Sequence, residues 1–260
     1  MTAYRAVSLD LWFTTCSYER GYEGQWRRDR LRELRSLVVA RDGARFELEQ
    51  LERASAELRA HSPHSDGRGY AHSPPLRFVE DLATHLGGRL TTPREEAGRR
   101  YSRAGLREHP PRVNPEIRPL VAALQRKGVS VMFVTNTGRM AQSWEEFLRD
   151  QGVPPPFSVV TSCETGWPKP DPRIFWEAAR RLGADPAGLL HVGDRWELDI
   201  KGARAAGCGA VLYRGLWHDY PEEEGYSTAI PDDGGDPVPV IEHLGELLSD
   251  DRWSLGSDRI

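Results

Sequence analysis

The sequence has few lysines and cysteines, no long apolar run and little net charge. Three of its 35 basic residues are lysine, namely Lys127, Lys169 and Lys201, and the rest are arginine. Arginine does not replace lysine where a compact ammonium group is required, so each lysine is a candidate for a specific role. The 3 cysteines lie far apart in the chain, which argues against a disulfide framework. They indicate a reducing compartment, and we expect the protein in the cytoplasm.

The absence of long apolar runs excludes a membrane-spanning helix, since no segment approaches about 18 consecutive apolar residues. The first 13 residues lack the basic and apolar stretches of a signal peptide and are instead typical of a buried strand. A net charge of −4 provides no broad cationic field for nucleic acid or an anionic membrane. We expect neither as a partner, and the sequence leaves the oligomeric state open.

Apolar runs alternate with amphipathic stretches after residue 113. We predict strands over 5–11, 129–134, 157–161, 189–192 and 210–213, and helices over 114–127, 142–150, 171–182, 198–206 and 238–248. This alternation predicts an α/β fold, with a parallel sheet covered by helices on both faces.

Residues 17–112 follow a different pattern and form an insertion after the first strand. Helical spacing of apolar residues predicts helices over 26–39, 46–58 and 76–86. A fourth helix follows a predicted capping box at 92–95, with Pro93 at the first helical position. We expect no strands in this segment. The chain is therefore predicted to have a core of residues 1–16 and 113–260 and a helical domain of residues 17–112.

Polar side chains follow the predicted strands. Ligands of such sheets bind beyond the carboxyl ends of the strands, so these side chains are expected to converge. They are Asp10 after the first strand, Thr135 and Asn136 after the second, Lys169 after the third and Asp194 after the fourth, with Asp199 five residues further on.

Two or three carboxylates with one lysine are the groups expected around a Mg²⁺ ion that faces a phosphate. Mg²⁺ prefers oxygen ligands and retains water, so one or two protein carboxylates suffice. Asp10 is then the candidate nucleophile, forming an aspartyl-phosphate. Thr135 and adjacent amides would hold the phosphoryl oxygens, and Lys169 would neutralise charge in the transition state.

Four stretches resemble the motifs of the haloacid dehalogenase (HAD) superfamily, in the order of that family. They are AVSLDLWFT with Asp10 and Thr14, VMFVTNTG with Thr135, GWPKPDPRIF with Lys169, and LLHVGDRWELDIKGARAAG with Asp194 and Asp199. The resemblance covers nearly all of the chain outside residues 17–112.

This resemblance implies a Rossmann-like core with an inserted helical cap of the C1 type. It also implies Mg²⁺-dependent hydrolysis of a small phosphorylated metabolite. The implied catalytic residues are Asp10 and Lys169, the implied substrate-binding residues are Thr14, Thr135 and Asn136, and the implied metal ligands are Asp10, Trp12, Asp194 and Asp199.

Trp12 departs from the pattern of the phosphatases in this family. They carry a second aspartate at this position, which protonates the leaving group and later activates water. Indole cannot do either. The family takes a metal ligand from the backbone carbonyl here, so the metal site is compatible with Trp12. Phe13 also stands where glycine is common.

Other branches of the family also lack the second aspartate. Its dehalogenases carry an aromatic residue there, but they use no Mg²⁺ and replace the acidic fourth motif, which this chain keeps in Asp194 and Asp199. A metal-independent 2-haloacid dehalogenase-like hydrolase is one alternative. A catalytically impaired binding or scaffold protein with the HAD fold is another. Phosphonatases use a cap lysine, and residues 17–112 contain none, which excludes that branch.

Several other features of the insertion have ordinary explanations. His61, His64 and His72 share a polar loop without a fourth ligand, so we expect a solvated loop and no metal site. Tyr22 and Trp26 are expected to pack in the core or at a hinge rather than to contact the substrate. One helix of the insertion carries a run of arginines, and we expect this run to form a solvated face rather than to contact an anionic substrate. The run comprises Arg27, Arg28, Arg30, Arg32 and Arg35.

Overall fold

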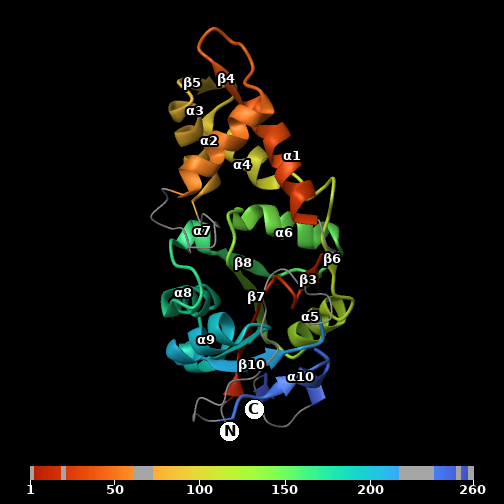
Figure 1. Cartoon of the computed structure of the whole chain (residues 1–260). Coiled ribbons are helices and arrows are strands. Elements are labelled where there is room, and N and C mark those ends of the chain that lie inside the picture. The colour runs from red at the N-terminus through yellow and green to blue at the C-terminus, as the bar shows by residue number, and fades with distance from the viewer. Residues whose placement is uncertain (1–2, 19–21, 61–72, 217–236, 250–252, 257–260) are drawn as a thin grey trace.

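Six parallel strands form the central sheet (Figure 1). The structure is a computed structural model, which describes residues 3–18, 22–60, 73–216, 237–249 and 253–256. The strand order is β11-β10-β9-β2-β7-β8, and every neighbouring pair is parallel. The strands are β2 (Ala6–Leu9), β7 (Ser130–Thr135), β8 (Ser158–Thr161), β9 (Leu189–Gly193), β10 (Gly209–Tyr213) and β11 (Val240–Ile241). This confirms the predicted α/β fold.

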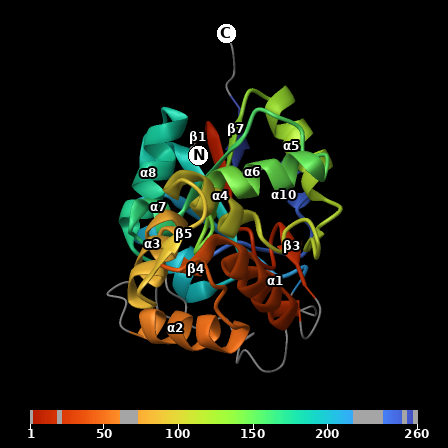
Figure 2. The same ribbon diagram turned by 90° about the horizontal axis from the view of Figure 1, so that it is seen from above.

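Helices cover both faces of the sheet, because its strands carry apolar side chains on both sides. On β7, Phe133 belongs to one buried apolar cluster and Val134 to another. The first cluster includes side chains of α5 (Ile117–Arg126) and α6 (Ala141–Asp150). The second includes side chains of α8 (Pro172–Leu182) and α9 (Lys201–Ala205). Figure 2 shows α8 on one side of the sheet and α5 and α6 on the other.

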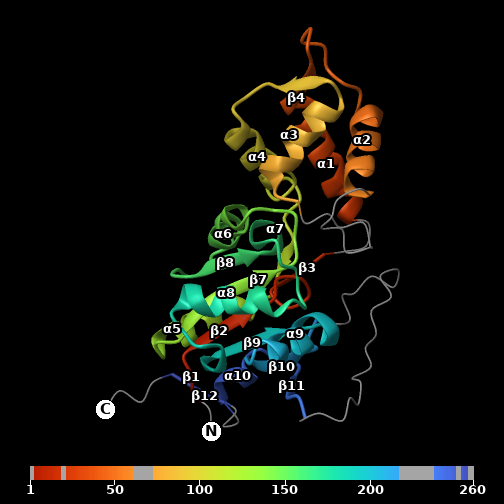
Figure 3. The ribbon, with the colours of Figure 1, turned by 90° about the vertical axis from the view of Figure 1, so that its left-hand side faces the viewer.

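Residues between β2 and α5 form a helical lobe, by which we mean α1 (Tyr22–Leu37), α2 (Leu48–Ala60), α3 (Pro75–His85) and α4 (Arg94–Arg103). These helices have a buried apolar cluster of their own, centred on residues such as Leu34, Leu51 and Leu82. Figure 3 shows the lobe standing at one end of the sheet-containing part, next to α6 and α7 (Ser162–Thr165). The four predicted helices are confirmed.

The expectation of no strands in this segment is wrong. β4 (Val38–Ala40) pairs antiparallel with β5 (Gly88–Leu90) at the far end of the lobe. The pairing is close at Gly88, where a Cβ atom would come within 2.4 Å of the carbonyl oxygen of Val39. Because the two strands are three residues long and 50 residues apart, helical periodicity in a local window does not reveal them.

The two ends of the inserted segment lie side by side. β3 (Cys16–Ser17) pairs antiparallel with β6 (Arg112–Val113). The division of the chain into residues 1–16 and 113–260 against 17–112 stays a prediction. None of the described helices is long and apolar enough to cross a lipid bilayer.

The predicted helix over 238–248 is wrong. The structure has the strand β11 there, followed by the short helix α10 (Glu246–Ser249). Pro239 accounts for the start of this segment, because proline disfavours helical backbone in the residue before it, Val238. The carbonyl oxygen of Pro239 accepts a hydrogen bond from the amide of Leu212, which aligns β11 with β10. Near the N-terminus, β1 (Ala3–Tyr4) pairs with β12 (Ser254–Leu255).

Two helix starts also differ from the prediction. Helix α4 begins at Arg94 with Pro93 at the N-cap and no side-chain cap, so the predicted capping box is wrong. Proline occupies the cap position itself, and the Thr92 hydroxyl donates to the Pro93 carbonyl instead. The predicted helix over 198–206 begins earlier, as the π-helix η2 (Trp196–Ile200) that leads into α9. The 3₁₀ turn η1 (Pro186–Gly188) precedes β9.

Candidate active site

Asp10 and Asp194 lie at the carboxyl ends of two adjacent strands. Asp10 follows β2 and Asp194 follows β9, and these strands pair with Leu9 beside Val192. The amide of Asp10 donates to the carbonyl oxygen of Val192 at 2.9 Å, which extends the pairing by one step. Both carboxylates are buried, with 5% and 3% of each residue exposed. The register of the sheet therefore holds the two acids together.

Lys169 is buried between two carboxylates. Its Nζ atom lies 2.5 Å from Oδ1 of Asp10 and 2.5 Å from Oδ1 of Asp199. The residue is 4% exposed and stands in the loop between α7 and α8. Asp171 caps α8 just beyond it by accepting from the amide of Arg173, as the sequence predicts. The structure thus brings together three residues that are separated by up to 189 positions in the chain.

Asp199 lies inside the π-helix η2, folded back against the end of β9. Its Oδ2 atom accepts a hydrogen bond from the amide of Arg195 at 3.0 Å. A Cβ atom at Gly193 would come within 2.3 Å of the Asp199 carboxyl carbon, so this position requires glycine. π-Helical turns often occur at functional sites, and this one places Asp199 in contact with Lys169.

His191 and Ser8 lie beneath the acids, and sequence reasoning missed both. His191 Nε2 is 3.1 Å from Oδ1 of Asp199, and His191 Nδ1 is 2.8 Å from the Ser8 hydroxyl. The two residues are register partners on β9 and β2 and are fully buried. The sequence did contain a signal for them, because each is a polar residue inside an otherwise apolar strand. Their proximity depends on the strand order, which the sequence did not predict.

Asp10, Asp194 and Asp199 form the one group of three possible metal-binding side chains found among the described residues. One oxygen of each lies within 4.8 Å of the others. Burial raises the pKa of Asp194 well above its ordinary value, and the charges of Asp10 and Asp199 raise it further. Burial also raises the pKa of Asp10, despite the opposing charge of Lys169. The cluster therefore has more negative charge than one ammonium group can neutralise.

For Lys169 and Asp199, neighbouring charges outweigh burial and favour the charged form of each group. Burial alone would lower the pKa of Lys169, but the charges of Asp10 and Asp199 outweigh burial and raise that pKa. Burial would likewise raise the pKa of Asp199, but Lys169 and His191 lower it below its ordinary value. Both groups are therefore charged at neutral pH.

Thr135, Asn136 and Thr14 surround this cluster in different ways. The Thr135 hydroxyl, at the end of β7, is buried and has no hydrogen-bond partner within the described part of the chain. Asn136 instead pairs with the main chain of Lys169, accepting from its amide at 2.7 Å and donating to its carbonyl at 2.9 Å. The Thr14 hydroxyl donates to Oδ1 of Asp194 at 3.4 Å. Their predicted contact with a substrate phosphate stays a prediction.

Trp12 belongs to an aromatic cluster at the boundary of the helical lobe. Its ring centroid lies 5.1 Å from that of Trp26 in α1, and 5.3 Å from those of Tyr18 and Trp144. Tyr22 and Trp26 both donate hydrogen bonds to the carbonyl oxygen of His109, in the segment that leads back to the sheet. This agrees with the expected packing role of Tyr22 and Trp26.

Phe13 has a left-handed backbone, with φ of +57°. Its amide donates to the Cys16 carbonyl at 2.7 Å in the tight turn after Asp10. A left-handed backbone disfavours residues with a Cβ atom, and this explains why glycine suits the position. The Phe13 side chain is 1% exposed, so its burial offsets that cost.

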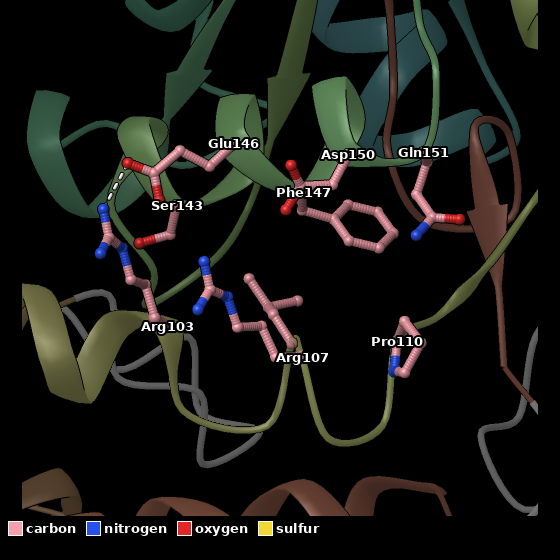
Figure 4. A pocket seen from close by; sticks show the side chains of 9 residues that line it. Arg103, Arg107, Pro110, Ser143, Glu146, Phe147, Asp150 and Gln151 are labelled. Atoms are coloured by element: carbon pink, nitrogen blue, oxygen red, sulfur yellow. Dashed lines mark hydrogen bonds and ion pairs between the residues drawn. The ribbon is translucent and has the colours of Figure 1, made fainter.

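A separate cavity of about 170 Å³ contains none of the predicted site residues. It lies between α6 and the segment after α4, where Arg103 pairs with Glu146 (Figure 4). His61, His64 and His72 fall outside the described residues.

Comparison with known proteins identifies relatives of the chain. Residues 4–207 match the sequence profile of a family described as haloacid dehalogenase-like hydrolase. A glyceraldehyde 3-phosphate phosphatase from Methanopyrus kandleri is 37% identical over 139 residues, which is 52% of this chain and 58% of that protein. A ribulose-1,5-bisphosphate 5-phosphatase from Halopiger xanaduensis is 30% identical over 187 residues, covering 70% of this chain and 73% of that protein.

A solved structure supports the same fold. A 2-haloacid dehalogenase from Pseudomonas syringae pv. Tomato superposes with a TM-score of 0.56 at 21% identity, over 95% of this chain and 97% of that one. The chain spans about half the length of the first curated relatives it matches. The family match covers most of the chain, including all of the predicted site residues. The chain therefore belongs to the haloacid dehalogenase-like hydrolases.

Proposed function

We propose that this protein hydrolyses a small phosphate monoester in a Mg²⁺-dependent reaction, through an aspartyl-phosphate on Asp10. One observation carries the proposal: Asp10, Asp194 and Asp199 have oxygens within 4.8 Å of one another, and Lys169 contacts Asp10 and Asp199. Such a group fits a divalent cation and a phosphoryl group better than it fits a purely structural ion pair, since three buried carboxylates share one ammonium group.

The residues present fit a Mg²⁺ ion. The donors are all oxygens. Burial raises the pKa of Asp10 and of Asp194, and the charges of neighbouring carboxylates raise both further, which a bound cation would relieve. Asp10, Asp194, Asp199 and the carbonyl oxygen of Trp12 would hold the ion. Bound there, Mg²⁺ would neutralise part of the charge of the substrate phosphate and of the developing transition state.

The chain's own residues then account for the bond changes at phosphorus and for charge stabilisation, while the departing oxygen takes its proton from solvent. An Asp10 carboxylate oxygen forms a bond to phosphorus as the bond from phosphorus to the ester oxygen breaks. Lys169 stabilises the charge that develops, and Thr135 and Thr14 bind phosphoryl oxygens. Asn136 fixes the main chain of Lys169. Water then attacks phosphorus, which releases inorganic phosphate and regenerates the Asp10 carboxylate.

The relatives support a small substrate. Two of them are named as phosphatases of glyceraldehyde 3-phosphate and ribulose 1,5-bisphosphate. Trp26 of the helical lobe packs against Trp12, two residues beyond Asp10, so the lobe stands where it would exclude solvent from the site. The 3 cysteines are free and buried, which supports our placement of the protein in a reducing cytoplasm.

A substrate screen with and without Mg²⁺ tests this function. We expect phosphate release from at least one small phosphate monoester, and we expect EDTA to abolish it. Chloroacetate is included because Trp12 also suits a dehalogenase. Metal-independent release of chloride would contradict the proposal and favour the dehalogenase. Tight binding of phosphorylated metabolites without any turnover would favour a binding protein.

A further inference from the structure

Two arginines cross the boundary between the helical lobe and the loop after β7, one from each side. Arg30, in α1, donates from Nη2 to the carbonyl oxygen of Gly138 at 2.8 Å. Arg139, in the loop between β7 and α6, donates from Nη1 to the carbonyl oxygens of Ser102 and Ala104, at the end of α4. Each arginine therefore reaches from its own side of the boundary to the main chain of the other side.

Neither arginine forms an ion pair with a carboxylate anywhere in the described part of the chain. Arg139 is 2% exposed, and its Nη2 atom is buried without a hydrogen-bond partner. Nε of Arg30 is likewise buried and has no partner. Burial lowers the pKa of Arg139, and the nearby charge of Arg30 lowers it further. Lys169, the other deeply buried cation, has two carboxylates.

Aromatic rings supply part of the missing compensation. The guanidinium carbon of Arg30 lies 4.3 Å from the ring centroid of Tyr101, and that of Arg139 lies 4.4 Å from that of Trp26. Such contacts stabilise a buried guanidinium group only in part. An unpaired buried charge is costly, so an anion that accepts from the partnerless N–H groups of these arginines would stabilise this arrangement.

The arginine pair borders the proposed catalytic site. Arg139 lies in the loop that begins at Asn136, directly after Thr135. Arg139 stacks on Trp26, and Trp26 packs against Trp12, two residues beyond Asp10. Guanidinium groups bind carboxylates and phosphates through paired N–H donors, which suits them to an anionic ligand.

We propose that Arg30 and Arg139 form a second anion-binding site, which takes a carboxylate or a second phosphate on the substrate. The substrate is then a phosphate ester that carries a further anionic group. This inference rests on the proposed phosphatase function and adds the class of substrate to it.

Two pairs of phosphate esters, tested with the Mg²⁺-loaded protein, show the effect of a second anionic group on the substrate. O-phosphoserine differs from O-phosphoethanolamine by a carboxylate, and fructose 1,6-bisphosphate differs from fructose 6-phosphate by a phosphate. We expect kcat/KM to favour the more anionic member of at least one pair by about 10-fold or more, since a hydrogen bond to a charged group is worth about 1.5–3 kcal/mol. The pair that shows the preference identifies the anionic group.

Substitution of the arginines assigns that preference to this site. We expect Arg30→Gln and Arg139→Gln to reduce the preference to about 1-fold through a higher KM, and Arg139→Lys to restore part of it. Arg27→Gln removes the same charge from an exposed position of the same helix and should keep the full preference. Arg30 is partly exposed, so its variants test the proposal even if Arg139→Gln fails to fold.

The outcomes separate this proposal from the function on which it rests. Hydrolysis of the esters without a preference for either added anion would overturn the second site and leave the phosphatase intact. A preference that survives in both Gln variants would also overturn it. If neither these four esters nor any other ester of the substrate screen is hydrolysed or bound, the proposed function fails and this inference fails with it.

Discussion

Lys169 is the residue that holds the described site together, because it contacts two carboxylates from different parts of the chain at 2.5 Å each. Its role could be inferred from the sequence, since it is one of three lysines and lies in a recognisable motif. His191 could not, because its contact with Asp199 exists only when β9 folds beside η2. Arg139 is similar: in the sequence it is one arginine among many, and its burial depends on the helical lobe.

The side chain of Trp12 is expected to make the reaction sensitive to the leaving group. Indole cannot protonate an alkoxide, and general acid catalysis contributes about 10²–10⁴-fold. Aryl and acyl phosphates release weaker bases, so we expect the wild-type kcat/KM, which reports on departure of the leaving group, to rise steeply as the leaving-group pKa falls. Trp12→Asp should raise kcat/KM for alkyl esters more than for aryl esters.

The measurement is a rate series over leaving-group pKa for both proteins. Folding must be checked first, since Trp12 packs against three aromatic rings and its loss is expected to cost about 3–5 kcal/mol. A flat wild-type series of kcat/KM, with formation of the aspartyl-phosphate as the step that limits it, would show that another residue already supplies the proton.

Phe13 allows two opposing effects on stability to be compared. Glycine would relieve a left-handed backbone worth about 1–2 kcal/mol, but loss of the buried ring costs about 3–5 kcal/mol. Burial is the larger effect, so we expect Phe13→Gly to lower the free energy of unfolding by about 1–4 kcal/mol. Phe13→Ala loses the ring and keeps the strain, so it should be less stable than Phe13→Gly. Denaturant unfolding of both variants decides this, and an alanine variant at least as stable as the glycine variant would show that the turn carries no strain.

Among the elements, the connection from β9 through η2 to α9 determines the geometry of the acids. The sequence predicts the strand and the helix, because apolar periodicity marks both. It does not predict the π-helix, which depends on how Asp199 packs against Gly193. The β4–β5 pair and β11 were missed for a related reason. They are two or three residues long, and their partners are distant in the chain.

The close contact at Gly193 leads to a testable change. Gly193→Ala would place a methyl group 2.3 Å from the Asp199 carboxyl carbon, so Asp199 must move. We expect a loss of about 1–3 kcal/mol in the free energy of unfolding and weaker Mg²⁺ binding. Gly188→Ala is the matched control, since its Cβ atom would meet no atom within 4 Å. Calorimetric titration with Mg²⁺ that gives the same affinity for Gly193→Ala and wild type would contradict our assignment of Asp199 to the metal site.

At the scale of the whole molecule, the order of the strands brings together the carboxyl ends that carry the site. Alternating strands and helices were enough to predict the parallel sheet and the edge where its ligands bind. The strand order and the position of the helical lobe come from contacts between distant residues, such as Arg30 with Gly138. A single sequence contains no direct signal for such contacts.

The buried acids should couple the stability of the whole protein to pH and to Mg²⁺. The pKa values of Asp10 and Asp194 are raised, so their contribution to stability is fully present below the ordinary carboxyl value of about 4 and is lost as pH rises. The pKa of Asp199 is lowered, so its contribution is present above that value and is lost only in stronger acid. Mg²⁺ binds deprotonated carboxylates. We therefore expect its stabilising effect to grow with pH.

Thermal unfolding in EDTA and in saturating Mg²⁺, at about pH 5 and about pH 8, measures this effect. The increase in Tm caused by Mg²⁺ should be larger at the higher pH. In Asp194→Asn the increase should be smaller and should depend less on pH. An equal increase at both pH values in the wild type would contradict the assignment of the raised pKa values to the metal ligands.

Mass spectrometry of the Asp10 peptide tests the central claim most directly. The protein is mixed with an aryl phosphate and Mg²⁺ and quenched in acid during turnover. Because Trp12 cannot activate water, hydrolysis of the intermediate should be slow and the intermediate should accumulate. We predict a phosphoryl group on Asp10 that is absent in EDTA, together with loss of phosphate release in Asp10→Asn. Release of phosphate by Asp10→Asn at the wild-type rate, with no phosphoryl group on the wild-type peptide, would contradict the account.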